Sequence, residues 1–162
     1  MAASAEGAGL RDGMLALNAD YARAIDDDRL EDWPEFFCDP CLYKITTAEN
    51  HARGLEAGLV YADSRAMLRD RVAALRRANI YERQRYRHVV GLPAVRAGEG
   101  DLVVVESPFV VIRIMRDGTM DVFATGRYLD RVHAADDGAL RLAERIVVCD
   151  GSRVDTLLAL PL

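Results

Sequence analysis

Three cysteines supply the first candidate chemistry in this sequence. Cys38 and Cys41 stand at C-x-x-C spacing, which zinc sites and redox dithiols share, whereas Cys149 stands alone. A structural zinc ion takes four ligands, but the sequence has no second C-x-x-C and no H-x₃₋₅-H pair, and His51 is the only histidine near the two cysteines. The pair also lacks the βαβ setting of a thioredoxin motif. We therefore expect structural thiols, as in proteins of a reducing compartment.

The histidines are too dispersed to suggest an iron centre. His51, His88 and His133 are 37 and 45 residues apart, so no two form a local pair. A Rieske [2Fe–2S] cluster takes two cysteines and two histidines in paired motifs, and a mononuclear non-haem iron takes two histidines and a carboxylate. The sequence therefore predicts no metal ion and no other cofactor on this chain.

Acid–base chemistry is the enzymatic alternative that the residue types leave open. A Tyr–His–Asp set would suffice for proton transfer or dehydration on an uncharged ring compound. The residue types suited to such a set are Tyr21, Tyr43, Tyr61, His88, Tyr128 and Asp130. Tyr43, His88, Tyr128 and Asp130 are the pocket residues we expect if the chain is itself an enzyme. The competing interpretation makes the tyrosines core residues with one polar end, and gives His88 a structural hydrogen bond.

Length and composition are those of one globular domain. Half of the 162 residues are apolar and 29% are charged. No run approaches the roughly 20 apolar residues that a membrane helix needs. Residues 1–9 are small and lack the basic start and apolar core of a signal peptide, so we expect a flexible terminus on a cytoplasmic protein, followed by one domain over 10–162.

The charge is unevenly distributed along the chain. The net charge of −5 argues against nucleic acid as a partner. Residues 1–39 are acidic, whereas the segment from Arg65 to Arg87 has eight arginines against Asp70 and Glu82. Arginine forms flat, bidentate pairs with carboxylates and tolerates desolvation better than lysine, which suits it to protein interfaces.

Helical periodicity is found in the first half of the chain. Apolar residues recur at spacings of three and four from Leu10 to Ile25, which predicts an amphipathic helix ending near Asp26. A short helix is expected over residues 31–37. Another should begin after Ser64, which is a suitable N-cap residue.

The second half of the chain alternates between apolar and polar residues and turns repeatedly. The expected strands cover residues 41–46, 59–61, 86–96, 102–115, 119–131 and 140–150, with a loop over 48–58. Pro93 and Pro108 should lie at bulges or edges and help the sheet curl. The prediction is an α+β fold: a curved antiparallel sheet with the N-terminal helices packed in its concave face. This cone is shared by nuclear-transport-factor-2-like and ketosteroid-isomerase-like proteins, whose functions differ.

A cationic segment joins the helical half to the strands. If the segment is extended, Tyr81, Arg83, Arg85 and Arg87 fall on one side and the residues between them on the other. This face is either an interface with another subunit or a solvated strand whose arginines pair with the acidic first third of the chain. The apolar residues 157–162 would not remain in water, so they pack on their own fold or on a neighbour.

Four segments together resemble the small (β) subunit of aromatic-ring-hydroxylating dioxygenases. They are residues 33–37 (WPEFF), 78–88 (ANIYERQRYRH), 140–145 (LRLAER) and 155–162 (DTLLALPL). The last of these is most similar to the branch that acts on terephthalate, salicylate and anthranilate. The resemblance runs from about Leu10 to Leu162.

The resemblance implies a subunit of an oxygenase whose chemistry takes place on a different chain. Members of this family assemble with a larger α subunit, typically as an α₃β₃ hexamer, and the β subunits can associate as a trimer. The α subunit carries the Rieske [2Fe–2S] cluster and the mononuclear Fe(II) that dihydroxylate an aromatic ring in aromatic catabolism. The resemblance supplies no catalytic residue for this chain. The alternative remains a stand-alone isomerase or dehydratase of the ketosteroid-isomerase type, which needs Tyr, His and Asp together in the cone.

Overall fold

The computed structural model describes residues 5–78, 84–98, 100–153 and 160–162. The helices are α1 (Ala5–Asp26), the 3₁₀ helix η1 (Trp33–Phe36), α2 (Ala48–Ala52) and α3 (Arg65–Arg77). The strands are β1 (Phe37–Thr47), β2 (Val60–Ala62), β3 (Arg85–Val90), β4 (Ala94–Ala97), β5 (Leu102–Ile114), β6 (Met120–Ala134) and β7 (Leu140–Cys149). Within the described residues, no helix is long and apolar enough to cross a membrane.

The helices lie where they were expected, with differences in their bounds and one addition. α1 ends at Asp26, as its periodicity predicts, but it begins at Ala5, within the segment 1–9 that was expected to be a flexible terminus. The short helix expected over 31–37 is η1, and the strand expected over 41–46 already begins at Phe37. The Ser64 hydroxyl accepts a hydrogen bond from the amide of Met67 and so caps α3. The predicted loop 48–58 was partly wrong, because residues 48–52 form α2. The side chain of Thr47 caps this short helix by accepting from the amide of Asn50, a signal that apolar periodicity does not detect.

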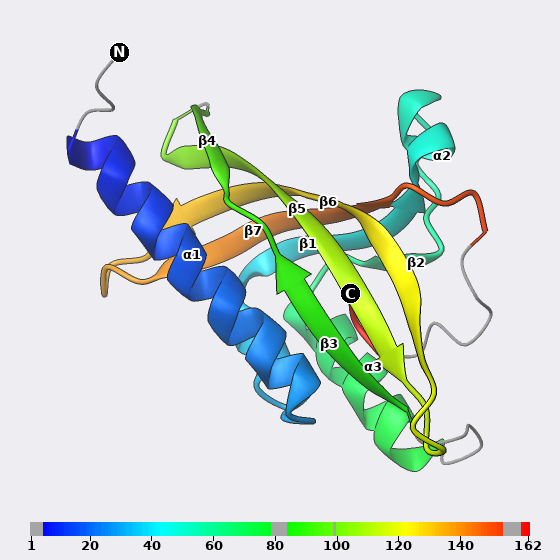
Figure 1. Cartoon of the computed structure of the whole chain (residues 1–162). Helices are drawn as coiled ribbons and strands as arrows, with labels where there is room; N and C mark the ends of the chain where they lie inside the picture. The colour runs from blue at the N-terminus through cyan, green and yellow to red at the C-terminus, as the bar shows by residue number, and fades with distance from the viewer. Residues whose placement is uncertain (1–4, 79–83, 99, 154–159) are drawn as a thin grey trace.

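The sheet is curved and open, and it confirms the α+β prediction with one difference in strand direction. The strands are ordered β2-β1-β7-β6-β5-β3, and β4 also pairs with β5. The antiparallel meander holds from β5 to β7, but β1 pairs with β7 in parallel, so the sheet is mixed. Figure 1 shows the long strands bending around the interior, where residues of α1 and α3 join those of the sheet in one core.

The strand predicted over residues 86–96 is divided in two at Gly91, and Pro108 explains why. Pro108 lies in β5 opposite the gap between β3 and β4. The carbonyl of Pro108 accepts a hydrogen bond from the Gly91 amide at 2.7 Å. Because the N–H and C=O groups of one residue in an antiparallel strand point to the same side, the N–H that proline lacks would also face this gap. Proline therefore costs the sheet no hydrogen bond here. A Cβ atom at Gly91 would lie 2.7 Å from Pro108 Cγ, which favours glycine there.

A bulge in β6 turns two consecutive apolar residues toward the core. The register between β5 and β6 shifts at Val111/Ile112, where Ala124 pairs with Val111 but Val122 pairs with Ile112. The extra residue, Phe123, packs on Tyr86 with ring centroids 5.0 Å apart. Such a bulge adds local twist to the sheet and so contributes to its curvature.

Candidate functional site

The cationic segment forms an exposed face of β3. Arg85 and Arg87 are exposed, and Tyr86 and His88, which alternate with them, lie on the opposite side as predicted and are buried. Tyr81 and Arg83, the other two residues of the expected interface, lie outside the described residues. The face seen by solvent is therefore cationic at Arg85 and Arg87.

Strand pairing extends this face into an apolar patch, which we call the outer patch. Residues directly opposite one another in neighbouring strands share a face of the sheet. The patch consists of Arg85, Arg87 and Val89 of β3, Val110, Ile112 and Ile114 of β5, and Met120 and Val122 of β6. Met120, Val122 and Val89 are 68%, 64% and 55% exposed. Contiguous exposed apolar residues bordered by charge are typical of protein–protein contact surfaces. Sequence reasoning found the arginines but missed the apolar part, which only the register assembles.

Other arginines of the cationic region pair with the acidic first third of the chain. Arg76 of α3 contacts the carboxylates of Asp28 and Glu31 at 2.7 Å each. Its hydrogen bond lowers the pKa of Glu31 to about 2. Arg87 Nη1 lies 3.7 Å from Asp26, so the ion-pair alternative applies to that residue in part. The carboxylates that pair with Arg76 are exposed, so these two pairs stabilise the fold only modestly, whereas Asp26 is buried.

Tyr43, a candidate acid–base residue, is held by the end of the chain. Its hydroxyl donates to the main-chain oxygen of Leu162 at 3.2 Å and accepts from the Leu162 amide at 3.1 Å. Burial raises the pKa of Tyr43 well above its ordinary value, so the phenol is neutral at physiological pH. The hydroxyl is therefore occupied by the protein itself.

Asp130 and Tyr128 lie beside a buried arginine that sequence reasoning did not single out. Arg145 is fully buried, and its Nε and Nη2 donate to the Asp130 carboxylate at 2.9 and 2.8 Å. Nη2 also donates to Asn18 at 2.7 Å. The guanidinium carbon lies 4.2 and 4.1 Å from the ring centroids of Tyr21 and Tyr128. Burial lowers the pKa of Arg145, but Asp130 more than offsets this and the net shift is upward. Asp130 is thus the counterion of a structural cation.

His88 is paired elsewhere, with Asp26 at the end of α1. Its Nδ1 lies 2.7 Å from Asp26 Oδ1, and its amide donates to Oδ2 at 2.9 Å. Both side chains are buried, and His88 Nε2 has no hydrogen-bond partner among the described residues. The pair ties α1 to β3. Tyr43, Asp130 and His88 thus each bind a different partner within the chain, whereas the Tyr128 hydroxyl, like His88 Nε2, is buried with no hydrogen-bond partner among the described residues.

The cysteines are free thiols, and the described residues hold no cluster of three or more metal-ligating side chains. Cys41 and Cys149 are buried, and Cys38 is half-buried. Burial raises the pKa of Cys41 and of Cys149 to about 11.

We expect native Cys41 and Cys149 to be alkylated by iodoacetamide at pH 8 about a hundredfold more slowly than in the unfolded chain. The reason is that the reacting species is the thiolate, whose fraction falls about tenfold for each unit by which the pKa rises. Peptide mass spectrometry after timed quenching measures this, with half-buried Cys38 as the internal comparison. Equal labelling rates in the native and unfolded chains would contradict the placement of these thiols.

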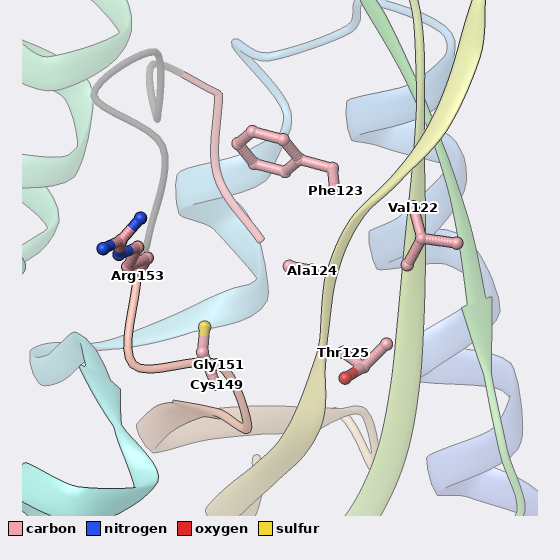
Figure 2. A pocket seen from close by; sticks show the side chains of 7 residues that line it. All are labelled: Val122, Phe123, Ala124, Thr125, Cys149, Gly151 and Arg153. Carbon is pink, nitrogen blue, oxygen red and sulfur yellow. The ribbon is translucent and has the colours of Figure 1, made fainter.

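A small pocket lies between β6 and the segment that follows β7, and Figure 2 shows the side chains around it. It measures about 190 Å³ and is lined by Val122, Phe123, Ala124, Thr125, Cys149, Gly151 and Arg153. Nearby, the Thr125 hydroxyl donates to Asp150 at 2.9 Å. The described lining residues include no acid to pair with a base, so we assign no catalysis to this pocket.

Comparison with known proteins gives a consistent result. The family model for the ring hydroxylating beta subunit matches residues 20–156. The beta 1 subunit of the terminal oxygenase component of terephthalate 1,2-dioxygenase from Comamonas is 54% identical over 92% of this chain and 96% of that protein. The anthranilate 1,2-dioxygenase small subunit from Burkholderia cepacia is 44% identical over 88% of each chain.

A solved structure agrees with these matches in sequence and in shape. It is the crystal structure assigned to the beta subunit of an aromatic-ring-hydroxylating dioxygenase from Novosphingobium aromaticivorans. The two chains are 40% identical and superimpose with a TM-score of 0.86, over 94% of this chain and 97% of the other. The chain therefore belongs to the family of ring-hydroxylating dioxygenase beta subunits.

Proposed function

We propose that this chain is the structural β subunit of a terminal oxygenase that dihydroxylates an aromatic carboxylate. The observation that carries the proposal is the 54% identity to a terephthalate dioxygenase subunit, together with the 44% identity to an anthranilate dioxygenase subunit. Both names denote aromatic carboxylates. In this proposal an α subunit carries the Rieske cluster and the Fe(II), and the two kinds of subunit form an α₃β₃ assembly. The buried tyrosines, Asp130 and His88 then serve the fold.

The proposed contact with a neighbouring subunit is the outer patch together with Tyr81 and Arg83. Its apolar centre is exposed in the isolated chain, and Arg85 and Arg87 border it on β3. A complementary surface would present apolar side chains with carboxylates at the matching edge.

Affinity purification of the tagged chain from its native host, grown on an aromatic carboxylate, tests the assembly. We expect a larger iron–sulfur protein in equal amount, with iron in the complex and none in the separated β subunit. Turnover of terephthalate and anthranilate by the complex then identifies the substrate. A chain that emerges alone and iron-free under these conditions would overturn the proposal.

The double variant Arg85→Glu/Val122→Asp should recover at least about tenfold less α subunit than the wild type. It reverses one border charge and places a carboxylate in the apolar centre, which opposes burial of the patch. Its melting temperature should remain near that of the wild type, because both side chains are exposed. Arg85 is preferable to Arg87, whose replacement would place like charges beside Asp26.

Arg53→Glu is the matched control for this variant. Arg53 is an exposed arginine just after α2, beside β1 and β7 and thus away from the outer patch. The control should assemble normally. Normal assembly of the double variant as well would exclude the outer patch as the contact.

A further inference from the structure

The described end of the chain lies inside the cone. Leu162 is fully buried, Pro161 is buried, and Leu160 packs partly against the core. Figure 1 places this end within the curve of the sheet, behind β5 and close to α3. Residues 160–162 are therefore part of the interior of the cone.

Two tyrosine hydroxyls converge on one oxygen atom at this position. Tyr21 of α1 donates to the main-chain oxygen of Leu162 at 2.8 Å, and Tyr43 of β1 donates to the same oxygen at 3.2 Å. The Tyr43 hydroxyl also accepts from the Leu162 amide. A carbonyl or carboxyl oxygen has two lone pairs, and two donors satisfy both. Burial raises the pKa of both phenols, which keeps them as donors at physiological pH.

Other elements, not the chain end itself, hold these hydroxyls in place. The Tyr43 ring packs edge-on against Trp33 and Phe37, with centroids 5.0 and 5.8 Å apart. The Tyr21 ring is fixed by Tyr128 at 6.2 Å and by the guanidinium of Arg145. The two hydroxyls that meet at Leu162 are thus carried by rings that pack against other aromatic side chains.

We propose that the site at which Tyr21 and Tyr43 converge is a ligand pocket, and that the chain fills this pocket with its own Leu162. Its chemistry suits a small apolar molecule with one carbonyl or carboxyl oxygen: the oxygen would bind Tyr21 and Tyr43, and the apolar part would take the place of the leucine side chain. Residues 160–162 act as an intramolecular competitor for this pocket. The proposal is independent of assembly with an α subunit.

The tripeptide N-acetyl-Leu-Pro-Leu is the probe, and a chain shortened to end at Ala159 is the receptor. We expect the shortened chain to melt at least about 5 °C lower than the full chain. The peptide should bind it in calorimetry and restore most of that loss. The full chain should not bind the peptide. Tyr43→Phe in the shortened chain should weaken binding about tenfold. If the shortened chain keeps its melting temperature and does not bind the peptide, the interior packs without residues 160–162. That result would overturn the proposal.

Hydrogen exchange in the full-length chain tests the proposal without any truncation. If a ligand can displace residues 160–162, the Leu162 amide must exchange through local opening. Its exchange should then be at least about a hundredfold faster than that of central amides of β6, such as the amide of Tyr128. This outcome supports the pocket even if the shortened chain does not fold. Exchange of Leu162 only with global unfolding would make residues 160–162 a permanent part of the core and refute their role as a competitor.

Discussion

Replacing Arg145 with methionine is expected to lower the free energy of unfolding by about 3–5 kcal/mol. The substitution keeps most of the side-chain volume but removes the only charge that balances the buried Asp130 carboxylate in the described structure. It also removes the donor to Asn18 and the cation between the Tyr21 and Tyr128 rings. Urea denaturation followed by far-UV circular dichroism measures the loss.

Two further variants separate the charge pair from simple packing. Arg145→Met/Asp130→Leu removes both charges together and should recover much of the lost stability, because no ion is then left buried without a partner. Arg131→Met changes an exposed arginine of the adjacent strand and should alter stability by less than about 0.5 kcal/mol. A loss below about 1 kcal/mol for Arg145→Met alone would contradict the buried pair.

Local signals predicted much of this fold because local chemistry determines those features. Ser64 caps α3, and Gly118 and Gly138 adopt positive φ in the turns of the two long hairpins, where glycine has no steric cost. Alternation along β3 correctly separated Arg85 and Arg87 from Tyr86 and His88. Each of these features depends on residues within a few positions of one another.

The interior could not be predicted in the same way, because its partners are far apart in sequence. Arg145 meets Asn18 across 127 positions, and Tyr43 meets Leu162 across 119. Strict alternation in β7 would place Leu142 and Arg145 on opposite faces of the sheet, but both are fully buried, because the pairing with β6 shifts between Glu144 and Leu142. The parallel pairing of β1 with β7 likewise follows from the packing of the whole sheet.

The placement of these polar residues also explains how a cone can serve different functions. Its interior carries tyrosine, histidine and aspartate, the residue types of a small acid–base enzyme. In this chain Asp130 neutralises Arg145, His88 ties down Asp26, and Tyr43 holds Leu162. The same residue types thus stabilise the fold. The exposed apolar surface, the outer patch, lies on the outside of the sheet. This distribution favours a function exerted through a partner.

Alanine at Gly126 is expected to destabilise the chain by about 3 kcal/mol or more. A Cβ atom there would lie 2.0 Å from the carbonyl oxygen of Val148 and 3.0 Å from Cys149 Cα. These are main-chain atoms of the neighbouring strand, so no rotamer change relieves the contact. Relief requires β6 and β7 to separate at the Gly126–Cys149 pair, close to the bulge that shapes the outer patch. Thermal and urea unfolding measure the loss, and recovery of the α subunit should fall with it.

Gly9→Ala makes the same chemical change where space is open. Gly9 lies in α1, and a Cβ atom there meets nothing within 4 Å. Alanine should stabilise the helix by about 0.5–1 kcal/mol, because it loses less conformational freedom than glycine on folding. The two variants are therefore expected to shift stability in opposite directions. A Gly126→Ala chain as stable as the wild type would mean that the β6–β7 pairing at this point is looser than the register indicates.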